Sequence, residues 1–193
     1  MRRRTLQPNF IVGIGGSSGS LNAFKKLLDA MPSNTGMAFV IVSHLMPSAN
    51  SQLAEILSAH TKMPITVASS AMSIRANHVY VIPPDADLLI EHLTFKVVTP
   101  RTMRNKQIDY FLISLAEAIG ARAIAVILSG YDGDGTEGCK HIKAKGGTTF
   151  AQDMSAEVPH MSLNAQASGC VDFVMSLGKI PGKLKSLAAA LKT

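Results

Sequence analysis

The feature that most constrains the fold of this chain is an alternation of short apolar runs with segments of helical periodicity. Residues 10–14 form an apolar run that ends in glycines, and residues 20–30 then carry three leucines and a phenylalanine at helical spacing. The same order returns with an apolar run at 37–42 and a helical segment at 51–60. Strands that alternate with helices in this way favour a mainly parallel sheet with helices on both faces.

The rest of the chain continues this order with one interruption. Residues 79–98 contain apolar stretches broken by Pro83, Pro84 and Asp85, which predicts a hairpin. Beyond it, the pattern predicts helices at 108–119, 136–144 and 180–191, a strand at 123–128, and short elements at 148–151, near 165 and at 171–174. We expect one α/β domain over residues 1–193, three-layered and doubly wound in the Rossmann manner, with residues 1–9 as a flexible leader.

Composition limits the partners that this chain can have. Of the 193 residues, 47% are hydrophobic and 17% are charged, which supplies a sizeable core and excludes global disorder. The formal net charge is +6, but no aromatic residues interleave with the basic runs and no nucleic-acid-binding motif occurs. We therefore expect a solvated basic surface with a mild preference for acidic partners, and no binding of nucleic acid.

The cysteines and the apolar runs indicate the compartment. Cys139 and Cys170 are the only cysteines, and their spacing excludes a zinc site or a Cys-x-x-Cys redox pair. We expect buried thiols in a reducing compartment. No apolar run is long enough to cross a membrane, and no apolar segment follows the basic start before Pro8. The sequence predicts a cytoplasmic protein without membrane insertion, cofactor or metal.

Polar side chains follow the three clearest strands, at the edge where the carboxyl ends of parallel strands meet. Ser17 and Ser18 follow the first strand, His44 follows the second, and Asp134 lies in the loop after the strand at 123–128. A hydroxyl, an imidazole and a carboxylate are the groups of a serine-hydrolase triad, in which the base takes the serine proton and the carboxylate orients the base. The order Gly-Gly-Ser-Ser-Gly before the first helix also fits the G-x-S-x-G turn that exposes a nucleophile.

Other interpretations of the same residues stay open at this point. A glycine-rich turn after a first strand is more often a nucleotide-phosphate cradle, and Gly13, Gly15 and Gly19 loosely match the dinucleotide fingerprint. However, the second strand ends in Ser43 and His44 and not in the acidic residue that would hold a ribose. A histidine at a strand end is often structural, and carboxylates in a glycine-rich loop can shape the turn and cap the next helix.

At these residues the chain resembles the catalytic domain of the bacterial chemotaxis protein-glutamate methylesterases, from about residue 10 to residue 174. The matching segments are 14–19 around the serines, 43–47 around the histidine, 79–84, and 128–135 around the aspartate. The residues alone do not separate Ser17 from Ser18 as nucleophile. The resemblance assigns the nucleophile to Ser17.

The resemblance implies a serine esterase that hydrolyses glutamate γ-methyl esters on chemoreceptors, with deamidation of glutamine in many family members. It implies attack by Ser17, with His44 as general base and then acid and with Asp134 orienting His44. The backbone N–H of Tyr131 is the implied oxyanion donor, with Ser18 assisting nearby. The implied partners are the methylated cytoplasmic helices of chemoreceptors, and a receiver or methyltransferase domain in a longer parent chain.

Two alternative functions belong to other classes. The family usually has a single residue between the histidine and the following proline, whereas this chain has Leu45 and Met46. This difference suggests a catalytically silent module that kept the fold and binds receptors. The glycine-rich turn, taken alone, suggests a nucleotide-binding oxidoreductase domain.

Overall fold

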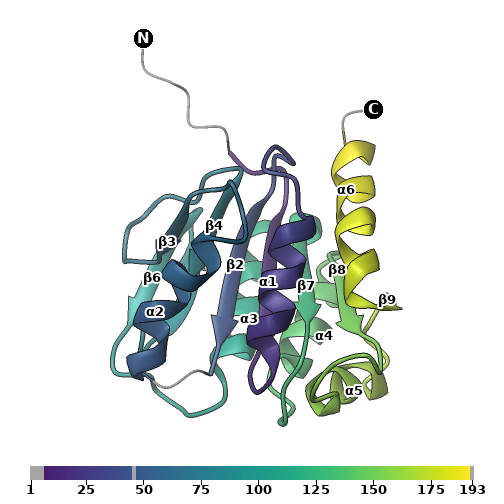
Figure 1. The fold of residues 1–193 in the computed structure, drawn as a ribbon. Coiled ribbons are helices and arrows are strands. Elements are labelled where there is room, and N and C mark those ends of the chain that lie inside the picture. Colours follow the sequence, from purple (N-terminus) through teal and green to yellow (C-terminus); the bar gives the residue numbers. More distant parts are fainter. Residues whose placement is uncertain (1–6, 45–46, 192–193) are drawn as a thin grey trace.

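The structure is a computed structural model that describes residues 7–44 and 47–191, except for the side chains of residues 47–51. Within these residues, seven strands form one sheet in the order β3-β4-β2-β1-β7-β8-β9, and every neighbouring pair is parallel. Helices cover both faces of this sheet (Figure 1). The predicted three-layered α/β fold is therefore confirmed.

The helices and strands alternate along the chain, as the apolar pattern predicts. In chain order they are β1 (Ile11–Gly16), α1 (Ser20–Ala30), β2 (Ala38–Ser43), α2 (Pro47–Ser58), β3 (Ile65–Val67), β4 (His78–Val81), β5 (Asp87–Glu91), β6 (Thr94–Val98), α3 (Gln107–Ile119), β7 (Ala123–Ile127), α4 (Thr136–Ala144), β8 (Thr148–Gln152), α5 (His160–Ala167), β9 (Phe173–Met175) and α6 (Ile180–Ala190). No helix in the described ranges is both long and apolar enough to span a membrane.

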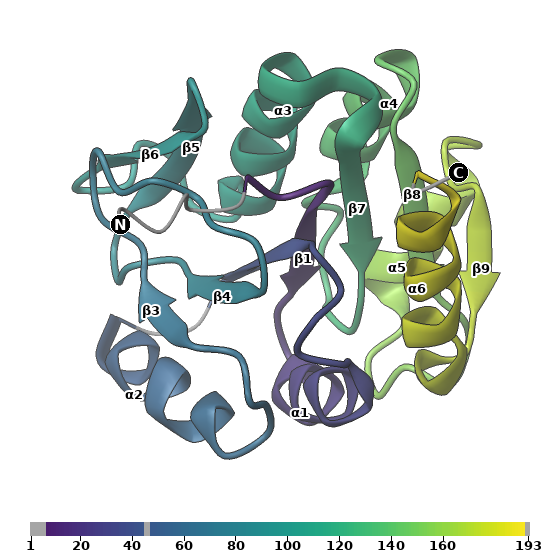
Figure 2. The ribbon, with the colours of Figure 1, turned by 90° about the horizontal axis from the view of Figure 1, so that it is seen from above.

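Two apolar cores lie on opposite faces of the sheet. Helices α1, α2 and α6 cover one face, where Phe24 and Phe39 are fully buried. Helices α3, α4 and α5 and the β5–β6 hairpin cover the other face, where Phe111 is fully buried (Figure 2). Since both faces are covered, the central strands are apolar along their whole length, and this explains their continuous apolar runs in the sequence.

Strand β1 approaches α3 closely through its glycines. A Cβ atom added to Gly13 would lie 2.6 Å from Leu112 Cδ2, and one added to Gly15 would lie 2.6 Å from Ile108 Cγ2. Both glycines lie inside a fully buried strand that pairs with β2 and β7. These two positions of the apparent dinucleotide fingerprint therefore allow the helix to pack on the strand, and they do not form a phosphate-binding loop.

The structure corrects the hairpin predicted for residues 79–98. Residues 79–81 belong to β4, which lies between β2 and β3 and is parallel to both. Only β5 and β6 form the antiparallel hairpin. The apolar pattern also misses β3, which has three half-buried residues, and it indicates only an unspecified short element where α5 lies. Helix α5 is short and has no continuous apolar stripe, so its sequence carries little helical periodicity.

The loop before β2 binds the backbone of Asn9. Of the expected leader at 1–9, residues 1–6 lie outside the described residues. Pro8 is buried, and Asn9 N–H donates to Gly36 O at 2.9 Å. Pro8 and Asn9 of the predicted leader thus contact the domain, whereas Gln7 is exposed.

The order of the strands determines where a site can form. The chain passes from β1 to β2 on one side, and it later adds β7 on the other side of β1. Such a reversal leaves a crevice beyond the carboxyl ends of the strands. The ends of β1, β2 and β7 all reach this edge, which is the lower edge of the sheet in Figure 1. The segments after these strands carry the predicted site residues.

Two helical glycines provide a matched test of the packing between α3 and α4. A Cβ at Gly138 in α4 would lie 2.5 Å from Leu112 Cβ in α3, so Gly138→Ala is expected to cost about 1–3 kcal/mol. Gly182 in α6 has no neighbouring heavy atom within 4 Å of such a Cβ, so Gly182→Ala is expected to stabilise by about 0.5 kcal/mol. Urea unfolding of both variants measures these changes. Equal stability of Gly138→Ala and the parent would contradict the close contact.

Candidate functional site

The turn from β1 to α1 carries Ser17, which is half-buried, and Ser18, which is exposed. Ser129, just after β7, forms two hydrogen bonds with this turn. Ser17 N–H donates to Ser129 O at 2.8 Å, and Ser129 Oγ donates to Ser18 O at 2.7 Å. The left-handed residue of the turn is Gly19, with φ of 72°, whereas Ser17 is not among the described residues with positive φ. The segment forms the expected sharp turn, but without a left-handed backbone at the serine.

His44 directly follows β2 and lies between two carboxylates. Its side chain is only 5% exposed. Nε2 lies 2.5 Å from Asp134 Oδ2, and Nδ1 lies 3.3 Å from Asp132 Oδ2. The second contact is an ion pair without hydrogen-bond geometry, so Nδ1 has no hydrogen-bond partner among the described residues. The two ring nitrogens thus face two acids of the same loop.

The two acids change the protonation of the imidazole. Burial alone would lower the pKa of His44, but the hydrogen bond to Asp134, the close ion pair with Asp132 and the negative charges of both acids outweigh burial and raise it to about 9. Burial also opposes ionisation of Asp132, yet His44 and the Asp134 N–H hold the pKa of the Asp132 carboxyl below its usual value. His44 is therefore an imidazolium at neutral pH and must lose a proton before it can act as a base.

Asp134 is fixed by the amino-terminal end of α3. Its side chain is fully buried, and it accepts from Ile108 N–H at 3.0 Å and from Asp109 N–H at 2.8 Å. The Asp109 carboxylate in turn accepts from Gly135 N–H and Gly138 N–H, both at 2.9 Å, where α4 begins. The two helices therefore cap each other by exchanging carboxylates across the loop, which satisfies N–H groups that have no partner inside a helix.

Ser17 and His44 line one cavity at the carboxyl edge of the sheet. Its volume is about 380 Å³, and Ser18, Asn22 and Glu157 also line it. No hydrogen bond joins Ser17 Oγ to His44 in the part of the chain that the structure describes. The serine and the imidazole therefore share a cavity, but the proton-transfer contact between them is not formed.

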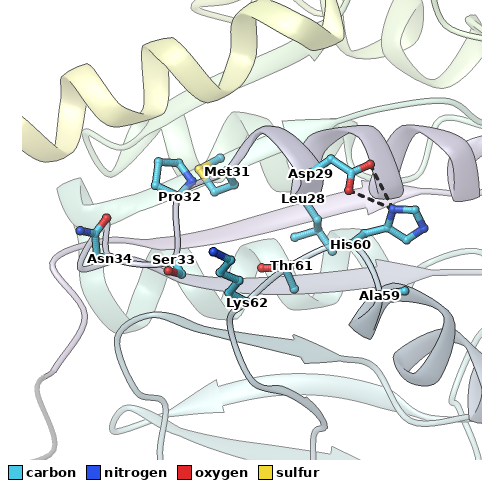
Figure 3. A pocket seen from close by; sticks show the side chains of 10 residues that line it. All are labelled: Leu28, Asp29, Met31, Pro32, Ser33, Asn34, Ala59, His60, Thr61 and Lys62. Atoms are coloured by element: carbon cyan, nitrogen blue, oxygen red, sulfur yellow. Dashed lines mark hydrogen bonds and ion pairs between the residues drawn. The ribbon is translucent and has the colours of Figure 1, made fainter.

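A larger cavity of about 500 Å³ lies at the opposite, amino-terminal edge of the sheet, between the ends of α1 and α2. Figure 3 shows its lining, in which Asp29 is paired with His60 and Lys62 lies nearby. This cavity contains none of the residues predicted as a triad. Size alone does not identify the site, and the predicted residues Ser17 and His44 line the smaller cavity.

Tyr131 presents an unused backbone donor beside the site. Its side chain is 66% exposed and stacks on His160, with ring centroids 5.7 Å apart. The preceding residue is fixed, because Gly130 N–H donates to Val158 O and Gly130 O accepts from Met161 N–H, both at 2.9 Å. The Tyr131 N–H donates to no acceptor among the described residues, so it is available to a ligand.

The sequence-predicted residues meet at one edge, but the sequence reasoning missed three contributors. Ser129 anchors the serine turn, Asp109 fixes the loop that carries Asp134, and Asp132 contacts His44. The signal for Asp132 was its place in the same loop as Asp134. Asp109 has no local signal, since it lies inside a helix 26 residues away from Gly135. Leu45 and Met46, the residues of the unusual His-to-Pro spacing, lie outside the described residues.

The two cysteines and the possible metal ligands form no recognisable metal-binding group in the described residues. Cys139 and Cys170 are free and buried, as expected for structural thiols. Within residues 7–44 and 47–191, no group of three or more His, Cys, Asp or Glu side chains is arranged to hold a metal ion.

A family model and the named relatives of this chain point to the same family. The family model described as CheB methylesterase matches residues 12–184. A Leptospira interrogans protein, provisionally named a protein-glutamate methylesterase/protein-glutamine glutaminase, is 34% identical over 171 residues, which cover 86% of this chain and 89% of that protein. The Hydrogenovibrio crunogenus protein-glutamate methylesterase/protein-glutamine glutaminase is 31% identical over 184 residues, which cover 92% of this chain and 49% of that protein.

A solved structure gives the same result for the fold. The catalytic domain of the Thermotoga maritima CheB methylesterase matches with a TM-score of 0.85 at 28% sequence identity. The match covers 92% of this chain and 98% of that domain. The similarity therefore extends over the whole sheet and not only over the serine turn.

The free energy of unfolding should fall as the pH rises from about 6.5 to about 9. The folded-state pKa of His44 is about 9 and its ordinary value is 6.5, so the folded state binds this proton more tightly. The resulting stability is fully present below pH 6.5 and is lost as the pH rises through the folded pKa. It amounts to about 3 kcal/mol at most. Urea unfolding of the parent and of His44→Gln across this range isolates it, and identical pH dependence of the two would contradict it.

Proposed function

Because the chain belongs to the CheB methylesterase family, we propose that it hydrolyses glutamate γ-methyl esters on chemoreceptor helices and releases methanol. By the same chemistry it would deamidate glutamine at such positions, an activity that the names of its relatives include. The observation that carries the proposal is that Ser17 and His44 line one cavity while the buried Asp134 holds His44 from behind. This is the set of groups that acyl transfer by a serine requires.

The proposed reaction starts from the neutral imidazole of His44, after the resting imidazolium has lost its proton, and begins with proton transfer from Ser17 to His44. Nε2 is engaged by Asp134 at 2.5 Å, so Nδ1 is the nitrogen that accepts the proton. Ser17 Oγ then bonds to the ester carbonyl carbon, and the methoxy group takes the proton from His44 and leaves as methanol. A water molecule attacks the acyl-enzyme with His44 again as base, which restores Ser17 and yields the glutamate carboxylate.

The negative oxygen of the tetrahedral intermediate needs hydrogen-bond donors that are already in place. We assign the Tyr131 N–H to this role, and its lack of a protein acceptor supports the assignment. Ser18 is exposed beside Ser17 and is assigned an assisting role. The start of α1 faces the same turn, and the positive end of its dipole favours negative charge there.

The proposal extends to the partners and to the compartment. Receptor methylation helices are rich in carboxylates, so the net charge of +6 favours the encounter. Because the proposed substrates are cytoplasmic helices, we propose the cytoplasm as the site of action. We treat residues 1–193 as one catalytic domain. The Hydrogenovibrio crunogenus relative has more than half of its length outside the match, which supports a receiver or methyltransferase domain in a longer parent chain as a further partner.

Methanol release from a methylated chemoreceptor fragment tests the function and the nucleophile together. Ser17→Ala should lower the turnover rate by about 10⁴-fold or more, because the attacking oxygen is lost. The control Ser33→Ala, which removes an exposed hydroxyl at the opposite edge, should leave the rate unchanged. Full activity of Ser17→Ala would rule out this nucleophile. A parent chain that binds the fragment without releasing methanol would favour the silent receptor-binding module.

A further inference from the structure

Asp132 is a second carboxylate against the imidazole, and the reaction above gives it no role. Its Oδ2 lies 3.3 Å from His44 Nδ1, the nitrogen that must accept the Ser17 proton. The two carboxylates differ in how they are held. The Asp134 side chain is fully buried and accepts two helix N–H groups, whereas Asp132 is 32% exposed and its carboxylate accepts one N–H, from Asp134 at 3.1 Å.

We propose that Asp132 is a positioning residue that holds His44 as an imidazolium out of contact with Ser17, so that the site is at rest until this ion pair is released. The proposal rests on the proposed function in one respect, namely that Ser17 and His44 form the reacting pair. It adds that Asp132 governs when His44 can accept the Ser17 proton, a role that neither the triad nor the family similarity supplies.

The chemistry of the ring explains the resting state. A neutral imidazole has one N–H and one lone pair, whereas an imidazolium donates from both nitrogens and accepts from none. With Asp134 on Nε2 and Asp132 beside Nδ1, both nitrogens of His44 face negative oxygen. The positive charge of the protonated ring lies beside both acids, and the ring then has no lone pair for the Ser17 proton. The absence of a hydrogen bond between Ser17 Oγ and His44 in the described residues agrees with this state.

The other charged groups around His44 do not replace Asp132. Asp109 lies behind Asp134 and is paired with Lys106, whose Nζ is 3.2 Å from Asp109 Oδ2. Glu157 lines the same cavity from the loop between β8 and α5, and the serine turn contributes no ionisable side chain. Among these groups, only Asp132 lies against Nδ1. Its charge is therefore the one whose removal should free the base without disturbing the buried support.

A direct test follows the protonation of His44 by NMR, without any turnover. The experiment uses the whole chain with Ser17→Ala, alone and combined with Asp132→Asn, and with Asp132→Ser as a second uncharged replacement. The His44 midpoint should fall from about 9 towards neutral pH when the Asp132 charge is removed. The control Asp29→Asn removes a carboxylate from the His60 pair in the far cavity of Figure 3 and should leave the His44 midpoint in place. An unchanged midpoint in both Asp132 variants would overturn the proposal.

The pH profile of methanol release, measured with Ser17 intact, distinguishes an effect of Asp132 on the protonation of His44 from a general loss of structure. Asp132→Asn should raise the rate at pH 7 about tenfold for each pH unit by which the His44 midpoint falls. Its rate should equal that of the parent at pH values above both midpoints. A rate that falls by the same factor at every pH would overturn the proposal, since it would mark a structural loss. Absence of methanol release from all variants would count against the proposed function alone, because the NMR midpoints would still decide the role of Asp132.

Discussion

The exchange of carboxylates between the starts of α3 and α4 is the contact on which the geometry of the site depends. Asp134 accepts two N–H groups at the start of α3, and Asp109 accepts two N–H groups where α4 begins. The start of α3 therefore holds the loop that leads into α4, and the first turn of α3 in turn supplies the carboxylate that caps α4. The close approach of the helices at Gly138 belongs to the same arrangement, since a side chain there would push them apart. The imidazole of His44 is aligned by a carboxylate that packing has already fixed.

In this arrangement, backbone N–H groups hold two buried acids. The Asp134 side chain is fully buried and is paired with His44, whereas that of Asp109 is 4% exposed and is paired with the half-exposed Lys106. Backbone N–H groups do the remaining work, because the unpaired donors at a helix start stabilise negative charge over a short range. The negative charge of Asp134 then acts, together with that of Asp132, on the imidazole of His44 and raises its pKa. The carboxylate that caps the start of α3 thus also helps to set the proton affinity of the proposed base, His44.

The sequence predicts which residues meet at the site better than it predicts the contacts that hold them there. Ser17, His44 and Asp134 could be placed together because each follows a strand, and parallel strands bring their carboxyl ends to one edge. Ser129 and Asp109 could not be predicted, since their roles depend on side-chain contacts between segments that no periodicity relates. The hairpin prediction was wrong for residues 79–81, because apolar runs do not reveal which strand is the neighbour. The choice between Ser17 and Ser18 came from a family resemblance and not from the residues alone.

The central position of β1 links the site to the order in which the chain is made. Ser17 and His44 lie in the first quarter of the sequence, whereas Asp134, the start of α4 and one of the two neighbours of β1 all come after residue 122. A nascent chain that has emerged only as far as the β5–β6 hairpin therefore carries the serine and the histidine, but neither the strand nor the acid that completes their surroundings. Because such long-range contacts form only once both partners are present, the site is assembled late in synthesis. A ribosome-bound fragment of this chain therefore lacks β7 and Asp134 until most of the domain has been translated.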